Sequence, residues 1–358
     1  MLALLLPWAI VLRAEAPPDS SRLPRTNLLA HHNLKGEVVS GKSKADWRKR
    51  RAEVLEGMQA VMGPLPGKDR RCPLAPEVLE EVDCGAYVRR SITYAAEPGG
   101  RVPALLLIPK AAFQSKKRLP AVLALHPTDA EYGCRVVAEQ LRANYRAYGR
   151  DLAERGYVVL APAYPLMAQY QPDLKALGYQ SGTMKAIRDN MRGLDLLDSL
   201  PFVRPGKFGA VGHSLGGHNA IYTAVFDPRI AVVVSSSGFD CYLDYYGGEV
   251  ANWQVGRGWC QERYMPKLAD YRGRLQDIPF DFQELIAALA PRPVFINAPL
   301  GDANFKWRSV DAVVSAAMPV YRLYGVPQNL QVEHPDCPHD FPPQIREEAY
   351  RFLDSHLR

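Results

Sequence analysis

Apolar side chains follow two different periods along the chain, and the change of period separates two kinds of element. Between residues 45 and 62, apolar residues recur at helical spacing, which predicts an N-terminal helix. Residues 88–94 and 102–108 are instead rich in β-branched and aromatic side chains, and the turn residues 97–100 separate them. These two stretches therefore predict an antiparallel hairpin at the edge of a sheet.

Short runs of uninterrupted apolar residues follow this hairpin. They lie at residues 121–125, 157–161, 208–211, 230–234, 293–296 and 330–332. Runs of this length suit strands that are buried on both faces of a parallel sheet. Helical patterns alternate with them, at about residues 136–155, 184–200 and 343–357. The alternation predicts the α/β class, with a doubly wound, mostly parallel sheet after the N-terminal helix and hairpin.

Residues 239–290 interrupt this alternation and are rich in Phe, Tyr and Trp. We expect them to form an insertion above the C-terminal edge of the sheet, over the active site. The chain from residue 45 to residue 358 otherwise reads as one domain, since this length suits a single α/β sheet with insertions. Residues 17–44 are polar and begin with prolines, which predicts an extended N-terminal arm.

The first twelve residues are almost entirely apolar, and Ala14-Glu15-Ala16 follows them after Arg13. This run is too short to span a bilayer as a mature helix, but it has the length of the apolar part of a signal peptide. We therefore expect residues 1–16 to be a signal peptide, although no positive charge precedes the run. A secreted or periplasmic protein follows, with a cytoplasmic one as the alternative. No other segment predicts a membrane anchor.

Composition narrows the class of protein. Hydrophobic residues make up 47% of the chain and charged residues 23%, which is typical of a globular enzyme, and the net charge is only +6. The basic runs 47–51 and 116–118 lack interleaved aromatic residues, so we interpret them as solvated surfaces and expect no nucleic-acid partner. None of the six cysteines forms a CxxC pair, which argues against a zinc site. Local disulfides and free buried thiols both remain open.

The sequence Gly212-His213-Ser214-Leu215-Gly216-Gly217 is the strongest chemical signal in the chain. It lies between a predicted strand at residues 208–211 and a predicted helix at residues 219–226, as a nucleophile elbow requires. The sharp turn leaves no room for side chains two residues before and after the nucleophile, hence the glycines. Ser214 is therefore the candidate nucleophile, and the helix N-terminus beneath it favours developing negative charge.

A serine nucleophile needs a base, and two histidines follow the last predicted strand. His334 comes directly after the strand and suits a packing or capping role. His339 lies further along the loop, next to the final helix, where it can reach over the sheet edge to Ser214, and we choose it as the base. These histidines also lie close to Cys337 and Asp336, but their spacing matches no zinc pattern, so we expect no metal.

An acid must orient the base and stabilise its protonated form. Asp302 follows the predicted strand at residues 293–296 and gives the chain order Ser, Asp, His of the elbow enzymes. Asp240 is the rival, because it follows an earlier strand, whereas Asp311 suits a helix. We therefore choose Asp302 as the acid.

The oxyanion formed during attack needs backbone donors. The N–H of Leu215 is one candidate, and the loop after residues 121–125 should supply the other. Pro127 has no N–H, so Thr128 is our second candidate. His126 either closes this turn or contacts substrate. From the insertion, Trp253 and Tyr264 are candidates for stacking on a sugar ring, with burial in the core of the insertion as the alternative.

Taken together, these residues resemble a known family. The stretches that carry the likeness are 151–162, 212–217, 302–305 and 339–342. They resemble bacterial α/β-hydrolases of the dienelactone hydrolase and acetyl xylan esterase type, over about residues 45–358. The resemblance implies ester hydrolysis through an acyl-enzyme without a cofactor, and it places Ser214, Asp302 and His339 at the triad positions.

Two departures from related families refine this expectation. Dienelactone hydrolases use a cysteine nucleophile, so serine at position 214 favours ordinary esters. Glucuronoyl esterases have an arginine after the serine, and Leu215 occupies that position here.

The main hypothesis is a serine carboxylic ester hydrolase acting on a small-molecule or carbohydrate ester, for example by deacetylation. One alternative is a peptidase of the prolyl-oligopeptidase type, although the chain has no room for the large β-propeller of those enzymes. The other is a non-catalytic binding module on a hydrolase fold.

Overall fold

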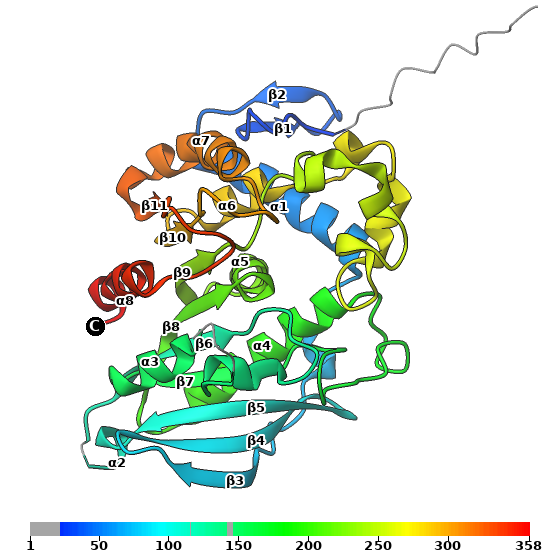
Figure 1. Ribbon diagram of the computed structural model, residues 1–358. Helices are drawn as coiled ribbons and strands as arrows, with labels where there is room; N and C mark the ends of the chain where they lie inside the picture. The colour runs from blue at the N-terminus through cyan, green and yellow to red at the C-terminus, as the bar shows by residue number, and fades with distance from the viewer. Residues whose placement is uncertain (1–21, 115, 142–145) are drawn as a thin grey trace, which may run out of the picture.

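The computed structural model describes residues 22–114, 116–141 and 146–358. Its centre is a nine-stranded sheet of order β11-β10-β9-β8-β6-β7-β5-β4-β3 (Figure 1). The strands are β3 (Glu77–Asp83), β4 (Tyr87–Glu97), β5 (Gly100–Pro109), β6 (Leu119–Leu125), β7 (Val158–Pro162), β8 (Val203–His213), β9 (Ile230–Ser236), β10 (Val294–Asn297) and β11 (Leu330–Glu333). The pairs from β7 through β6, β8, β9 and β10 to β11 are parallel, and β3, β4 and β5 join antiparallel. The predicted α/β sheet and its antiparallel start are confirmed.

The apolar runs explain why these strands lie in the middle of the molecule. Every residue of β7 is buried, as are residues 120–125 of β6 and 208–213 of β8. Side chains alternate between the two faces of a strand, so complete burial requires helices on both faces of the sheet. Figure 1 shows this arrangement, with α4 and α5 on one face and α3 and α8 on the other.

The helices are α1 (Lys44–Met62), α2 (Ala111–Gln114), α3 (Tyr148–Glu154), α4 (Gly182–Ser199), α5 (Leu215–Phe226), α6 (Phe282–Leu289), α7 (Trp307–Tyr324) and α8 (Pro343–Leu357). The helices predicted at residues 45–62, 184–200, 219–226 and 343–357 are present within four residues of those bounds, and no bounds were predicted for α2, α6 and α7. The prediction of one helix at residues 136–155 is wrong. Among the described residues of this stretch, the 3-10 helix η2 (Gly133–Val137) and α3 are helical, and residues 138–141, 146 and 147 are not. Glu139 forms an ion pair with Arg89 of β4 at 2.7 Å, which ties Glu139 to the sheet.

The N-terminal segment is bound to the rest of the molecule. Residues 22–43, part of the predicted arm, contain the hairpin of β1 (Ala30–His32) and β2 (Val38–Ser40), which packs on α1. Arg25 forms an ion pair with buried Asp281 at 3.0 Å, and Arg22 forms one with buried Glu284 at 3.0 Å. The predicted signal peptide, residues 1–16, lies outside the described residues.

The insertion at residues 239–290 consists mainly of 3-10 helices. They are η3 (Tyr245–Gly248), η4 (Val250–Trp253), η5 (Gly258–Cys260), η6 (Pro266–Tyr271) and η7 (Leu275–Asp277), and α6 ends the segment. Its aromatic rings pack on one another, and α6 packs against α5 and α7. This aromatic core explains why a segment with so little regular structure holds a fixed shape.

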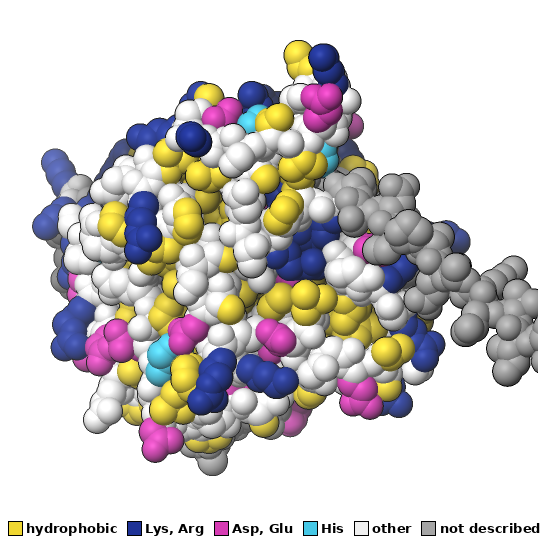
Figure 2. All heavy atoms as spheres, turned by 90° about the horizontal axis from the view of Figure 1, so that it is seen from above, with side chains coloured by type: hydrophobic (Ala, Val, Ile, Leu, Met, Phe, Trp, Pro, Cys, Tyr) yellow, Lys and Arg dark blue, Asp and Glu magenta, His cyan; other side chains and the backbone are white. Residues whose placement is uncertain are grey.

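The surface has mixed character. Figure 2 shows the molecule from above, with Lys and Arg scattered among Asp, Glu and uncharged residues over that face. Within the described residues, no helix combines the length and the apolar character that a membrane span requires. All six cysteines lie in the described part of the chain and carry free thiols.

Candidate active site

Ser214 lies at the turn between β8 and α5, in a backbone conformation that few residues adopt. Its φ of 55° and ψ of −124° lie outside the ordinary regions for an L-residue. The glycines on either side make this turn possible. A Cβ at Gly212 would lie 2.1 Å from the backbone carbon of Gly216, and one at Gly216 would lie 1.9 Å from the carbonyl oxygen of Leu125. The strand, turn and helix predicted around Ser214 therefore form a nucleophile elbow.

The elbow lies where the order of the sheet reverses. The chain runs from β6 to β7 on one side and then returns to β8 on the other side of β6. In open α/β sheets, ligands bind at this reversal, outside the carboxyl ends of the strands. Ser214 follows β8 and Thr128 follows β6, so both candidates flank the reversal. This topology explains why residues so far apart in sequence lie together at one edge of the sheet.

His339 and Asp302 form a hydrogen-bonded pair. The Nδ1 of His339 lies 2.8 Å from Oδ2 and 3.0 Å from Oδ1 of Asp302, and the carboxylate is almost completely buried. Burial alone would raise the pKa of Asp302. The hydrogen bond and charge of His339 and the backbone N–H groups of Asn304 and Phe305 outweigh burial, so the pKa lies below its ordinary value. Asp302 is therefore ionised and accepts the Nδ1 proton, which leaves Nε2 of His339 as the basic atom.

The loop of His339 is itself anchored. Arg146 donates to the carbonyl oxygen of His339 at 3.0 Å and to Oδ1 of Asp340 at 3.1 Å. Asn297, at the end of β10, donates to the carbonyl oxygen of Asp340 at 2.9 Å. The ring of His339 lies 4.9 Å from that of His213, the residue before Ser214, measured between centroids. The base and its acid therefore lie beside the elbow.

The two rivals considered from the sequence have other partners. His334 bonds the carbonyl oxygen of Ala298 at 2.7 Å and Asp311 of α7 at 2.9 Å. Asp240 accepts from the backbone N–H of Lys306 at 3.2 Å, and burial raises its pKa to about 8. Neither residue contacts His339. Asp302 and His339 are thus the acid and base candidates that the structure brings together.

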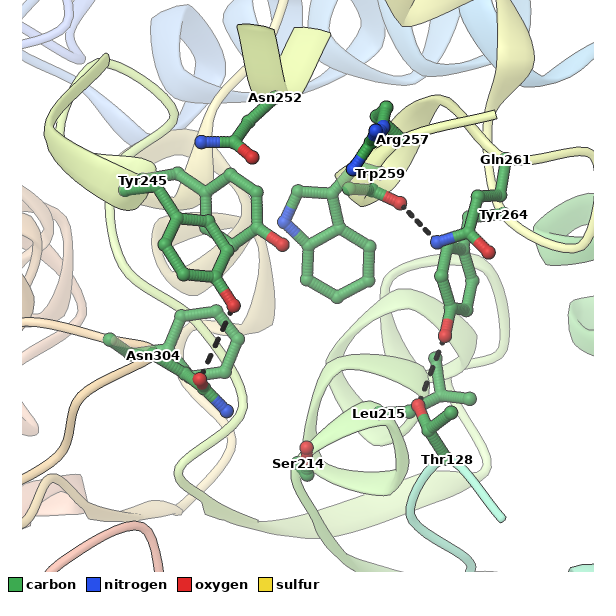
Figure 3. Close-up of a pocket in the computed structure, with 13 residues that line it drawn as sticks. Thr128, Ser214, Leu215, Tyr245, Asn252, Arg257, Trp259, Gln261, Tyr264 and Asn304 are labelled. Atoms are coloured by element: carbon green, nitrogen blue, oxygen red, sulfur yellow. Dashed lines mark hydrogen bonds between the residues drawn. The ribbon is translucent and has the colours of Figure 1, made fainter. Parts of the chain in front are cut away.

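A cavity of about 320 Å³ opens above Ser214 (Figure 3). Its walls come from the elbow, the Thr128 loop, the insertion and the loop after Asp302. The lining residues are Thr128, Ser214, Leu215, Tyr245, Tyr246, Asn252, Arg257, Gly258, Trp259, Gln261, Tyr264, Asn304 and Phe305. The cavity is therefore mostly aromatic and polar.

The oxyanion candidates lie at the base of this cavity, beside Ser214 (Figure 3). Leu215 is the first residue of α5, where a backbone N–H has no acceptor within its own helix. The N–H of Thr128 bonds no described residue, and its side-chain oxygen lies 3.0 Å from the hydroxyl of Tyr264. Both backbone donors are thus available to a substrate oxygen.

Two of the three predicted substrate-binding residues do not reach the cavity. Trp253 is completely buried, and its ring packs on Tyr242 and Tyr245 in the core of the insertion. His126 is also buried, because one ring nitrogen bonds the carbonyl oxygen of Pro127 and the other accepts from the N–H of Tyr164. The predictions for these two residues are wrong, since their positions are structural. Tyr264 does line the cavity, as predicted.

Several residues of the cavity wall were not predicted from the sequence. Trp259, Tyr245, Arg257 and Phe305 line the cavity. Trp259 stacks on buried His218, with the ring centroids 4.3 Å apart and an interplanar angle of 18°. The one signal for these residues was the aromatic content of the insertion, which does not say which rings turn inward.

No protein groups in the described part of the chain form a metal site, because it holds no cluster of three or more His, Cys, Asp or Glu side chains of suitable arrangement. The candidate chemistry described above uses only protein groups.

Family models match two overlapping parts of the chain. The dienelactone hydrolase family matches residues 102–246, and the fungal glucuronyl esterase family matches residues 182–325. The second match occurs although Leu215 stands where glucuronoyl esterases have arginine. Both matches include the elbow, and the second also includes Asp302.

Individual relatives are similar at low identity. YtaP of Bacillus subtilis (strain 168), named as a hydrolase, is 24% identical over 330 residues, which covers 86% of this chain and all of YtaP. The 4-O-methyl-glucuronoyl methylesterase 1 of Wolfiporia cocos (strain MD-104) is 28% identical over 183 residues, 46% of this chain and 44% of that protein. The match thus spans less than half of the fungal enzyme.

Solved structures show the same fold. A glucuronoyl esterase from Solibacter usitatus superposes with a TM-score of 0.72 at 19% identity, covering 93% of this chain and 97% of the other. A promiscuous esterase from a marine bacterial metagenome gives a TM-score of 0.68 at 18% identity, covering 92% and 96%. The chain is therefore a hydrolase of the α/β-hydrolase fold, similar to the dienelactone hydrolases and the glucuronoyl esterases.

Proposed function

We propose that this protein is a serine esterase that hydrolyses carboxylic esters of carbohydrates. The observation that carries the proposal is the buried, ionised Asp302 bonded to His339 beside a strained Ser214 elbow. A strained turn and a buried carboxylate both lower the stability of the fold. Their occurrence together beside one histidine is typical of a catalytic site. The names of the similar proteins support the choice of ester substrates.

In the proposed mechanism, Ser214 Oγ attacks the ester carbonyl carbon and its proton passes to Nε2 of His339. Asp302 stabilises the imidazolium that forms. The N–H groups of Leu215 and Thr128 bind the oxyanion of the tetrahedral intermediate. His339 then gives the proton to the departing alcohol, which leaves an acyl group on Ser214.

Hydrolysis of the acyl-enzyme repeats these steps with water. His339 removes a proton from the water as its oxygen attacks the acyl carbon. When the second intermediate collapses, the proton returns to Ser214 Oγ and the carboxylic acid is released. His339 therefore carries the proton in both halves of the reaction, and water supplies the second nucleophile.

The walls of the cavity support a carbohydrate as substrate. Trp259, Tyr245 and Tyr264 offer aromatic faces and edges of the kind that pack on the C–H groups of sugar rings. Asn252, Gln261 and Asn304 add neutral donors and acceptors that match hydroxyl groups.

The test is covalent labelling with a fluorophosphonate probe. Wild-type protein should react at Ser214, and S214A should lose labelling completely because no activated hydroxyl remains. The matched control is S355A, a serine of α8 whose hydroxyl bonds the carbonyl oxygen of Phe352. S355A should label like the wild type. Equal labelling of wild type and S214A would contradict the proposal.

A peptidase is the second candidate, since a dipeptidyl-peptidase 5 of Porphyromonas gingivalis is 28% identical over 166 residues, 23% of its own length. An ester and an amide of the same acid separate the two functions. We expect turnover of the ester to exceed that of the amide by several orders of magnitude, and comparable rates would favour the peptidase.

We also propose that the protein acts outside the cytoplasm, on the basis of the signal-peptide pattern at residues 1–16. N-terminal sequencing of the protein recovered from the periplasm or the medium should show cleavage after Ala16.

A further inference from the structure

One charged side chain lines the cavity above Ser214. Among the described residues that form its walls, Arg257 alone carries a charge, and the other polar members are neutral amides and hydroxyls. Figure 3 shows Arg257 at the end of the cavity away from Ser214, beyond the indole of Trp259. A substrate bound over Trp259 with its ester at Ser214 would therefore extend toward the guanidinium group.

The guanidinium group of Arg257 has no partner within the described protein. Its backbone forms hydrogen bonds with Gln254 and Cys260, but no side-chain hydrogen bond or ion pair involves it. Arg229, by contrast, contacts three carboxylates. Arg257 is exposed, and its charge is available to a ligand in the cavity.

No acidic side chain joins Arg257 in the lining of the cavity. No Asp or Glu is among the described residues that line it. Just outside the lining the chain carries both signs, with Glu249 and Glu262 as well as Arg263 and Lys306. The charge within the cavity lining is therefore positive and favours an anion.

The fixed wall beside Arg257 limits where this anion can lie. Trp259 is held by its stack on His218, which in turn stacks on Tyr222 of α5 at 4.0 Å. Arg257 is only two residues before Trp259, so its backbone is positioned by the same wall. The anion and the ring that packs on Trp259 should accordingly belong to one ligand.

We propose that the substrate of this site is an ester of an acidic carbohydrate, and that Arg257 binds a free carboxylate at some distance from the ester. This inference rests on the proposed esterase function. A guanidinium group matches a carboxylate because it can donate two parallel hydrogen bonds to the two oxygens. The neutral amides and aromatic rings then bind the sugar between the carboxylate and the ester.

The experiment compares two methyl esters of one uronic-acid disaccharide. In the first, the second sugar keeps a free carboxylate; in the second, that carboxylate is reduced to a primary alcohol. For wild type at low ionic strength we expect kcat/KM to be about fivefold higher for the acidic ester, the range of a partly exposed charge-assisted contact. The preference should fall as salt is added.

Two variants test whether Arg257 causes the preference for the acidic ester. R257Q should bring the ratio of the two kcat/KM values close to one. The matched control is R272Q, an exposed arginine of the same insertion that is absent from the cavity lining and has no side-chain partner. R272Q should keep the wild-type ratio. An equal rate for both esters in wild type, or an unchanged ratio in R257Q, would overturn the inference and leave the esterase proposal intact.

Two further outcomes are decisive. If wild type hydrolyses neither disaccharide ester, the inference fails, and the fluorophosphonate labelling of Ser214 decides the esterase proposal separately. Competition by disaccharides without an ester identifies the anion, one with a carboxylate and one with a sulfate at the same position. Inhibition by the carboxylate form that R257Q weakens supports the assignment, whereas inhibition by the sulfate form alone contradicts it.

Discussion

Ser214 has its unusual backbone angles because the residues on either side leave it no alternative. Neither Gly212 nor Gly216 can carry a side chain, because a Cβ at Gly212 would meet the backbone of Gly216 and one at Gly216 would meet the backbone of Leu125. The strain at Ser214 is therefore held by a backbone contact and does not depend on the catalytic side chains. A rigid turn of this kind fixes the direction of the hydroxyl before substrate arrives.

We predict that G212A abolishes most of the activity. A Cβ at position 212 would lie 2.1 Å from the backbone of Gly216, so the elbow must open and displace Ser214. A displacement of about 1 Å costs roughly a hundredfold in rate. Hydrolysis of a simple acetyl ester measures this loss, with circular dichroism as a check on folding. The control is G206A, at a positive φ of 73° with open space around it. G206A should keep its activity, and similar losses in both variants would refute this account of the turn.

Asp240 shows what burial does to a carboxyl group that forms no ion pair within the described part of the chain. Burial raises its pKa to about 8, against an ordinary value of 3.8, although the N–H and charge of Lys306 oppose the shift. Folded protein therefore holds this proton in a pH range where unfolded protein has lost it. The contribution of Asp240 to stability accordingly decreases as the pH rises from about 4 to about 8.

We predict that D240N removes this pH dependence. The amide cannot ionise, but its oxygen can still accept from Lys306. The free energy of unfolding of D240N minus that of wild type should increase between pH 4 and pH 8, by an amount on the order of a few kcal/mol. Urea unfolding at several pH values measures it. E249Q, at an exposed position of the insertion, is the control and should follow the wild type. Parallel curves for D240N and wild type would contradict the prediction.

At the scale of elements, α4 is joined to the sheet by buried charges as well as by apolar packing. Lys185 of α4 is completely buried and contacts Glu97 of β4 at 2.9 Å and Asp189 one turn further along the helix. Tyr170 and Tyr179, from the segment between β7 and α4, donate to the same carboxylates. The cluster therefore ties a long connection to the helix and the strand that lie beneath it.

We predict that K185M destabilises the protein by about 3–5 kcal/mol, because two buried carboxylates lose their shared cation. Denaturant unfolding at neutral pH measures the change. E154Q is the control, since it removes an exposed pair between Arg150 and Glu154 within α3, and it should change stability by less than about 0.5 kcal/mol. A loss in K185M as small as that in E154Q would show that Lys185 is dispensable.

Elements were predicted well from the sequence where burial alone determines them. The apolar runs of β6, β8 and β9 contain no polar side chain that could face solvent, so the sequence alone indicates that these strands are buried in the middle of the sheet. The prediction of one helix at residues 136–155 failed because the apolar residues at the two ends of this stretch lie in two separate helices, η2 and α3, and Glu139 forms an ion pair with distant Arg89. A contact between segments so far apart in the chain does not change the spacing of apolar residues, so the sequence pattern does not reveal it.

At the scale of the whole molecule, the candidate catalytic residues could be chosen from the sequence, whereas most of the substrate-binding residues could not. Ser214, Asp302 and His339 each follow a strand of the parallel part of the sheet, and their order along the chain is a property of the fold, so the sequence was sufficient to choose them. Their joint catalytic role stays a prediction until the labelling experiment. Trp253 and Trp259 are equally aromatic and lie in one insertion, yet only Trp259 faces the cavity. That difference depends on how the 3-10 helices pack, which composition does not encode.

The reversal of strand order between β6 and β8 has a consequence for how this protein can change over time. The residues proposed to break the bond are rooted in the sheet, whereas most of those proposed to select the substrate come from irregular turns laid over it. Exchanging residues 245–264 for the corresponding turns of another hydrolase should redirect selectivity while the reaction itself persists. New specificities can thus arise by editing one surface segment, with the interior left as it is.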